Sequence, residues 1–378
     1  MNMKMRNSKI FINENYLQLS ETQFVSAQCN SQTERSRRLQ ISGTKNSAIS
    51  GQKITRREFN SRLAKIGAGL LAATVLPSFG TLAQNNLFEG KFIDVHHHLG
   101  SDLMTDAAHF TFDPIINWMD KNSVSQTVLL SPIQYPETYY PDRDGNVIRN
   151  DELLEKFQET NGRLLPFCIV HYDAFTSTKE IVKILKRFKK KGVIGFGELK
   201  PRDTLGNSGN LPLDDPKMKR IYAACAEVDF PVLLHIDNKH AVDQPGLPAM
   251  ENVLKEFADV NFIGHANGWW NSITGDVKEL KGYPKGKVTS GGAAVRLLEN
   301  YTNMYADLSA NSGLNAITRD QEFGKKFLVD FSDKLMFGTD AIGGTGCESH
   351  FDFYNKIDLP EEVKAKLFRD NTRNLLKI

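Results

Sequence analysis

Cysteine is scarce in this sequence, which has four in 378 residues. Cys29 lies in a leader that we expect to be removed, and the other three have no metal-site spacing, so a disulfide framework is excluded. Cys168 and Cys225 lie in apolar patterns typical of a strand and a helix, which predicts buried thiols. Cys347 follows Asp340 in a glycine-rich loop, where it could line a site.

A strong overall charge is also missing, because the formal net charge is only +2. Residues 1–83 hold 12 Lys and Arg against 4 Glu, a net of +8, so the remainder carries a net of −6. The part of the chain expected to fold therefore lacks the basic surface of a nucleic-acid-binding protein, and no nucleic-acid partner is expected.

The apolar stretch at residues 66–77 is too short for a comfortable membrane span. It follows Thr55-Arg-Arg-Glu-Phe59, which resembles the twin-arginine export motif, and precedes small residues at 81–83 that suit a cleavage site. We therefore expect a signal peptide over 55–83, which the twin-arginine export machinery recognises, and a periplasmic or secreted protein. An ordinary basic amphipathic helix is the alternative.

The two segments that flank this leader have different characters. Residues 1–54 are polar and lack strong periodicity, which predicts disorder or an over-extended start. Residues 84–378 have an ordinary globular composition and are expected to form one domain. No lipobox cysteine lies near Ala83, so no stable membrane anchor is expected.

Strand and helix patterns alternate after residue 90, which predicts a parallel sheet covered by helices. Helical patterns such as 178–188 and 217–225 separate eight strand candidates. Eight alternations predict an α/β fold of the (β/α)8 TIM-barrel type, and a doubly wound open sheet is the alternative. The strand candidates begin near Phe92, Val124, Leu164, Val193, Pro231, Val260, Met304 and Leu335.

The first strand ends in three consecutive histidines. Strand alternation points His96 and His98 to the same side and His97 to the other. Four later apolar runs also end in a residue that can bind a metal. All strand carboxyl ends meet on one face of a barrel, so the sequence predicts a metal site there. The later residues are Glu198, His235, His265 and Asp340.

Several motifs together resemble the amidohydrolase superfamily, and within it the amidohydrolase-related (amidohydrolase-2) family of metal-dependent hydrolases. The resemblance covers about residues 92–377. It implies a barrel that holds one or two divalent ions, with zinc as the first expectation and manganese or iron as alternatives. The motifs are Ile93–His98, Leu211–Met218, Pro231–His235, Gly264-His265, Phe337–Asp340 and Asn371–Leu376.

The resemblance also implies roles for individual residues. His96 and His98 would be the ligands from the first strand and His235 the ligand from the fifth. His265 would be the ligand from the sixth strand or a catalytic imidazole. Asp340 would be both a ligand and the general base.

Glu198 departs from the pattern of relatives that hold one metal. Gly197-Glu198 resembles the glutamate of TatD-type nucleases, which suggests a carboxylate that bridges two ions. Two other interpretations remain open: Glu198 could pair with Lys200, which shares its side of the strand, or Lys200 could itself be a carbamylated ligand.

Substrate-binding candidates lie near the same strand ends and in the long connections 199–215 and 266–302. Packing is an equal alternative for the two tryptophans. The candidates are Lys200, His171, Asp173, Asn267, Trp269 and Trp270.

We expect an exported hydrolase that uses metal-activated water on an amide, lactone or ester bond of a small molecule. A metal-dependent lyase, either a decarboxylase or a hydratase/dehydratase, is the alternative on the same scaffold. A barrel that only binds metal or carbohydrate is disfavoured by the full set of ligand and acid–base residues. A metallonuclease is disfavoured by the acidic domain.

Overall fold

The computed structural model describes residues 90–100, 103, 109–137, 148–200 and 211–378. The expected N-terminal segment 1–54 and the expected signal peptide 55–83 lie outside these residues. In the described part of the chain, no helix is both long and apolar enough to cross a membrane.

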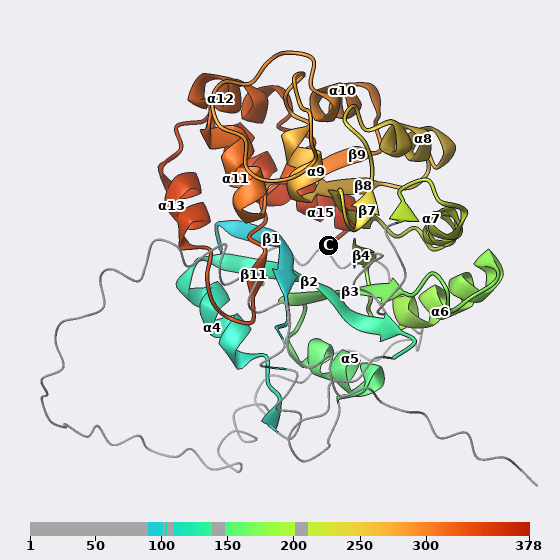
Figure 1. Ribbon diagram of the computed structural model, residues 1–378. Coiled ribbons are helices and arrows are strands. Elements are labelled where there is room, and N and C mark those ends of the chain that lie inside the picture. Colours follow the sequence, from blue (N-terminus) through green and yellow to red (C-terminus); the bar gives the residue numbers. More distant parts are fainter. Residues whose placement is uncertain (1–89, 101–102, 104–108, 138–147, 201–210) are drawn as a thin grey trace, which may run out of the picture. The chain divides into compact units, whose positions relative to one another are not determined.

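Eight parallel strands begin within two residues of the predicted positions. They form a sheet that is curved as a half-barrel with helices around it, so the predicted α/β class is confirmed (Figure 1). The strands are β1 (Phe92–His98), β2 (Val124–Tyr135), β3 (Leu164–Val170), β4 (Gly195–Leu199), β6 (Val232–Asp237), β8 (Phe262–His265), β9 (Met304–Asp307) and β10 (Leu335–Met336).

The strand order is β10-β9-β8-β6-β4-β3-β2-β1-β11, where β11 is Ala341–Ile342. The order follows the chain in one direction, whereas a doubly wound sheet reverses it at a switch point. Two short strands extend this sheet, because β7 (Ala241–Val242) pairs with both β6 and β5 (Leu211–Pro212).

Helices occupy the connections between the strands, and four more helical elements follow the last strand, β11. They are α4 (Asp113–Lys121), α5 (Asn150–Glu159), α6 (Thr178–Lys190), α7 (Pro216–Val228), α8 (Pro248–Glu256), α9 (Ala266–Asn271), α10 (Ala293–Asn300), α11 (Ala310–Thr318), α12 (Gln321–Asp330), α13 (Glu348–Lys356), α14 (Glu361–Ala365), the π-helical turn η3 (Lys366–Asp370) and α15 (Asn371–Leu376). The long connection 266–302 thus contains α9 at its start and α10 near its end.

Local sequence explains where α6 and α7 begin. Ser177 and Glu180 form a capping box at the start of α6, with the Ser177 amide donating to Glu180 Oε2 at 3.2 Å. At the start of α7, Asp215 accepts a hydrogen bond from the Lys217 amide, and Pro216 occupies the first helical position. These caps fix the two helices that follow β3 and β4.

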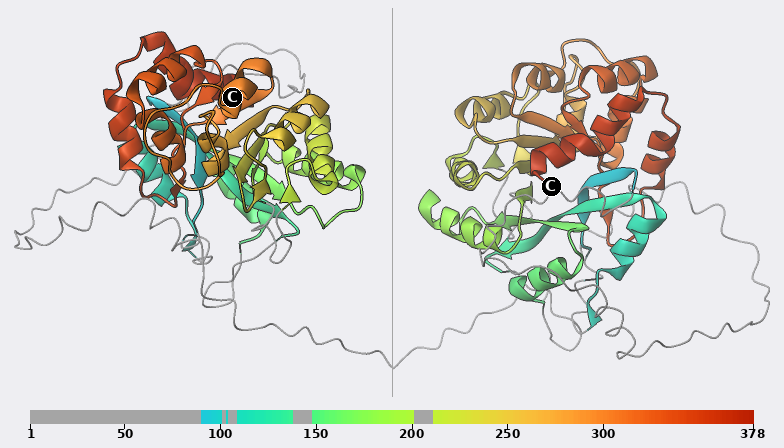
Figure 2. Two further views of the ribbon diagram at one scale, coloured as in Figure 1. Left: turned by 45° about the horizontal axis from the view of Figure 1, so that its top comes forward. Right: turned by 180° about the vertical axis from the view of Figure 1, so that it is seen from behind.

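Inward-facing side chains from most of the strands form a small apolar cluster. The carboxyl-terminal helix α15 closes this cluster with two of its leucines. Asn371 Nδ2 attaches the helix to the sheet, because it donates to Ser332 O before β10 and to Leu335 O at the start of β10. The rear view in Figure 2 shows this helix near the centre of the strands. The cluster comprises Val95, Val128, Leu130, Leu165, Phe167, Leu233, Ile263, Met336, Leu375 and Leu376.

Candidate metal centre

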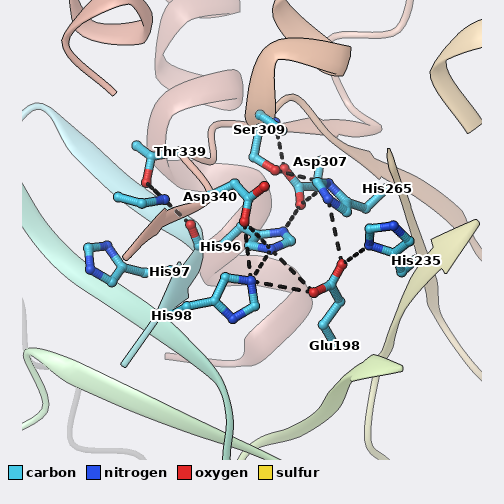
Figure 3. A network of polar contacts seen from close by, with 12 residues as sticks. His96, His97, His98, Glu198, His235, His265, Asp307, Ser309, Thr339 and Asp340 are labelled. Carbon is cyan, nitrogen blue, oxygen red and sulfur yellow. Dashed lines mark hydrogen bonds and ion pairs between the residues drawn. The ribbon is translucent and has the colours of Figure 1, made fainter. Parts of the chain in front are cut away.

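The residues predicted at the strand ends lie together at the carboxyl end of the sheet (Figure 3). His96 and His98 come from β1, and Glu198 from β4. Imidazole and carboxylate groups from β6, β8 and the segment after β10 complete the set. His97 points the other way, as predicted, and its ring packs 4.7 Å from the Trp118 ring. Strand alternation therefore explains which of the three histidines enter the centre.

Ligand atoms of His96, His98 and Asp340 lie within 4.8 Å of one another in this centre, and Glu198 belongs to a neighbouring group with His96 and His265. His98 Nε2 lies 3.2 Å from His96 Nε2, 3.2 Å from Asp340 Oδ1 and 3.4 Å from Glu198 Oε2. His96 Nε2 lies 3.3 Å from Asp340 Oδ1 and 3.9 Å from Glu198 Oε2. Bond lengths of about 2.0–2.1 Å place neighbouring ligands of tetrahedral zinc about 3.3 Å apart. This nitrogen and oxygen donor set therefore fits a divalent metal.

Backbone and side-chain bonds hold Asp340 against β1. The Asp340 amide donates to His96 O at 2.8 Å. The preceding Thr339 donates to Asp94 twice, from its amide at 2.9 Å and from its hydroxyl at 2.7 Å. Asp94 is fully buried, so this anchor is shielded from water and fixes the carboxylate of Asp340 beside the two histidines.

Asp307, which the sequence analysis missed, orients two of the imidazoles. It ends β9, is fully buried, and its Oδ2 lies 2.6 Å from His96 Nδ1 and 3.3 Å from His265 Nδ1. Its Oδ1 accepts the Ser309 amide at 2.6 Å, and Ser309 Oγ lies 3.0 Å from His265 Nδ1. Because each Nδ1 is turned toward Asp307, Nε2 is the nitrogen of both rings that faces the centre.

The signal for Asp307 was present in the sequence. A strand was predicted near Met304, and Asp307 ends it, as Glu198 and His265 end theirs. The same strand-end rule would have found it.

Charge in the centre keeps its carboxylates ionised. Burial opposes ionisation, but the charges of Lys200 and His235 lower the pKa of Glu198 well below its usual value. In the same way, burial raises the pKa of Asp340, and His96 outweighs it and lowers this pKa well below the usual value. Ionised carboxylates are the form that binds metal.

The two buried imidazoles that share Asp307 have opposite shifts. Burial would lower the pKa of His96, but Asp307 and Asp340 raise it well above the usual value. Burial and the neighbouring charge of His96 lower the pKa of His265, which is therefore neutral. A neutral His265 with its Nδ1 toward Asp307 presents Nε2 as an acceptor.

His235 lies on the other side of Glu198 from His98. Its Nδ1 is hydrogen-bonded to Glu198 Oε1, and its Nε2 lies 3.4 Å from Asp237 Oδ2. Glu198 Oε2 also forms an ion pair with Lys200 Nζ at 2.7 Å, as in one of the interpretations left open above. The two oxygens of Glu198 therefore serve two different groups of residues.

A family model described as amidohydrolase, of the amidohydrolase-2 type, matches residues 93–378. The chain belongs to this family. The family is metal-dependent, and the described residues include groups of His, Glu and Asp whose ligand atoms lie within 4.8 Å of one another. No curated protein sequence matches the chain significantly.

Several solved structures are similar to this family member. A probable 2-pyrone-4,6-dicarboxylic acid hydrolase from Acinetobacter baumannii, with citric acid bound, has 16% identity and a TM-score of 0.49, and the match covers 76% of this chain and 100% of that one. A putative 2-pyrone-4,6-dicarboxylic acid hydrolase from Pseudomonas putida has 15% identity and a TM-score of 0.49, with coverage of 76% and 97%. A dihydroxybenzoic acid decarboxylase from Polaromonas with bound manganese has 15% identity and a TM-score of 0.44, with coverage of 76% and 96%.

Two of the expected substrate-binding residues follow β3 in this family member. His171 is buried, and its Nδ1 accepts the Asp173 amide at 3.2 Å. Burial lowers the pKa of His171, so its ring is neutral. The Asp173 carboxylate is exposed and pairs with Lys217 Nζ at 2.6 Å.

The other three candidates lie in α9. Asn267 is half-buried. Trp269 and Trp270 are buried in the hydrophobic core, and Trp270 Nε1 donates to Asp307 O at 3.0 Å. A Cβ added at Gly264 would lie 2.5 Å from the Trp269 ring, so the absence of a side chain there makes room for the indole. These positions match the packing alternative for both tryptophans, because neither ring is open to a ligand.

Proposed function

We propose that this protein is an exported metal-dependent hydrolase that uses metal-activated water on an amide, lactone or ester bond of a small molecule. One observation carries the proposal. The four ligand atoms of His96, His98, Glu198 and Asp340 lie 3.2–3.9 Å apart in the pairs described above, at a buried strand-end position. Zinc is the first expectation for this donor set, and manganese and iron are the alternatives.

A divalent ion bound there would lower the pKa of a water molecule to about 7 and polarise a substrate oxygen. Asp340 is the proton carrier in this proposal, because its carboxylate is ionised and its side chain is 17% exposed. It takes a proton from the attacking water and delivers it to the leaving group. The neutral His265, whose Nε2 is an acceptor, is assigned as a ligand or proton acceptor.

We assign substrate contacts to residues at the rim of the centre. Lys200 is 23% exposed at the side chain and adjoins Glu198, so it suits an anionic substrate group. His171, Asp173 and Asn267 remain candidates at neighbouring strand ends. Trp269 and Trp270 are not included, because both are buried.

We propose that the sheet closes into a (β/α)8 barrel through the segment after β10. Three backbone bonds support the closure: Val95 N to Phe337 O at 3.0 Å, Asp340 N to His96 O at 2.8 Å and Gly343 N to His98 O at 2.9 Å. The apolar cluster of inward-facing strand residues suits the filled interior of such a barrel.

Export is the part of the proposal that depends on the sequence alone. Thr55–Phe59 supports recognition by the twin-arginine machinery and a periplasmic or secreted location. That route carries folded proteins, so the metal could be loaded before the protein crosses the membrane.

The test uses purified residues 84–378, stripped with chelator and reloaded with zinc, manganese or iron. We expect bound metal by elemental mass spectrometry and metal-dependent hydrolysis of a panel of lactones, esters and amides. The His98→Ala variant should lose the tightly bound metal, which is the metal that survives dialysis, and the activity. Metal-independent turnover, or wild-type metal content in His98→Ala, would refute the proposal.

A lyase is the second candidate, and one observation favours it. Ligand atoms of His96, His98 and Asp340 form one compact group, and Glu198 Oε1 is engaged by His235, an arrangement that suits one ion. Glu198→Ala distinguishes the candidates when only tightly bound metal, retained after dialysis, is counted. Two tightly bound ions that fall to one in the variant support a bridging glutamate and hydrolysis. One tightly bound ion in both proteins, with release of CO2 from aromatic acids, supports a decarboxylase.

A further inference from the structure

Three metal-binding side chains form a second cluster at the end of β6 and in the turn that leads to β7. His240 Nδ1 lies 2.6 Å from Asp237 Oδ2, and His235 Nε2 lies 3.4 Å from the same oxygen. The rings of His235 and His240 are 4.8 Å apart at an angle of 72°. All three ligand atoms fall within 4.8 Å of one another. None of these distances includes an atom of His96, His98 or Asp340.

The turn holds Asp237 in one orientation. Its Oδ1 accepts the amides of Lys239 at 2.7 Å and His240 at 2.6 Å. Pairing of Ile236 with Ala241 fixes both ends of the turn. These bonds to Oδ1 orient the carboxylate so that its other oxygen, Oδ2, points at the two imidazoles.

Glu198 prepares His235 as a ligand. His235 Nδ1 is hydrogen-bonded to Glu198 Oε1, so Nε2 is the nitrogen of the ring that faces Asp237 and His240. A carboxylate behind the far nitrogen is the usual support of a metal-binding histidine. His235 thus has the surroundings of a ligand, but on the side of the ring that faces away from His96 and His98.

We propose that His235 Nε2, Asp237 Oδ2 and His240 Nδ1 form a second divalent-cation site of the zinc type, separate from the centre at His96. A set of two histidines and one carboxylate leaves a fourth position open. The side chains of His235 and His240 are each 19% exposed and that of Asp237 is 13% exposed, so solvent or a ligand oxygen can fill this position. Neighbouring ligands of tetrahedral zinc lie about 3.3 Å apart. His240 Nδ1 and Asp237 Oδ2 therefore have to move slightly apart when zinc binds.

This site is expected to bind more weakly than the first centre. Asp237 is the single carboxylate of this cluster, whereas two carboxylates, Glu198 and Asp340, adjoin the histidines of the first centre. Zinc should therefore bind the chain in two classes, a tight one at His96 and a weaker, exchangeable one at His240.

The test is a zinc titration of chelator-stripped residues 84–378 by calorimetry, with elemental analysis after equilibrium dialysis. The wild type should bind two zinc ions in two classes. His240→Ala should weaken the second class by about tenfold or more, as expected for loss of a ligand or its support, and leave the first unchanged. Lys239→Ala is the matched control in the same turn, because it keeps the backbone amide that holds Asp237, and it should titrate like the wild type.

His98→Ala separates this proposal from the proposed function. It should remove the tight class and keep the class that depends on His240. Equal zinc stoichiometry and affinity in the wild type and His240→Ala would overturn the second site, whatever His98→Ala does. Circular dichroism of His240→Ala should match the wild type, and Asp237→Asn should reproduce the loss of the weaker class.

Discussion

Asp307 connects two imidazoles whose other nitrogens face the metal centre, so it acts on the metal through them. Asparagine at this position offers a single acceptor oxygen for His96, His265 and the Ser309 amide. Metal-ligand histidines that lose such a partner typically lose about 10–100-fold in metal affinity. We expect a loss of this size for Asp307→Asn, measured by competition with a chelator of known affinity.

The control for Asp307 is Ser309→Ala. This variant removes one contact to His265 Nδ1 and leaves the carboxylate in place, so its loss of affinity should be smaller. Unchanged metal affinity in Asp307→Asn would contradict the positioning role.

Asp340 carries the proton in the proposed reaction. Asp340→Asn removes this acceptor, so kcat should fall by about 10²–10⁴-fold, the usual contribution of a general base. Turnover and metal content should be measured on the same preparation.

Asp173→Asn provides the matched control, because Asp173 is an exposed carboxylate paired with Lys217. Its kcat should change little. Unchanged turnover in metal-bound Asp340→Asn would remove Asp340 from the chemistry.

The residues that enter the metal centre could be predicted because each one ends an apolar run. Strand alternation also predicted that His97 points away from the centre, and its ring packs on Trp118. Asp237 and His240 could not be found in this way. Their approach depends on a three-residue turn and on backbone amides that hold one carboxylate oxygen, and no period in the sequence encodes that geometry.

At the scale of the elements, α15 completes the interior of the sheet. Leu375 and Leu376 belong to the same apolar cluster as Val95 and Phe167. Truncation of a buried leucine to alanine costs about 2–5 kcal/mol of stability. We expect Leu375→Ala to lower the free energy of unfolding within this range, measured by urea denaturation.

The comparison for Leu375 is Ile378→Ala in the same terminal segment. Ile378 is 38% exposed, and substitutions at exposed positions usually change stability by less than about 0.5 kcal/mol. Equal effects of the two substitutions would show that α15 does not fill the interior.

The strands were predictable and the segment after β8 was not. Each strand is a short apolar run, and its burial on both faces is visible in composition. The tryptophans of α9 resemble a substrate-stacking pair in sequence. Only the packed structure shows Trp269 against Gly264 and Trp270 bonded to Asp307 O, because these contacts join different elements.

At the scale of the whole molecule, the proposed leader would decide where the protein works. A double substitution, Arg56→Lys with Arg57→Lys, keeps the charge of the expected motif and removes its arginines. We expect periplasmic accumulation to fall strongly, measured by fractionation and immunoblotting. Lys53→Arg nearby should accumulate normally, and unchanged accumulation of the double variant would refute twin-arginine export.

The anchor between Asp94 and Thr339 joins positions 245 residues apart, and the bond from His96 to Asp307 spans 211 residues. A growing polypeptide therefore presents its first histidines long before the ribosome has made their partners. The complete centre can assemble only after residue 340 has left the exit tunnel. A chain that stops short of this point lacks the carboxylate that completes the set, so its capacity to retain metal reports whether translation passed residue 340.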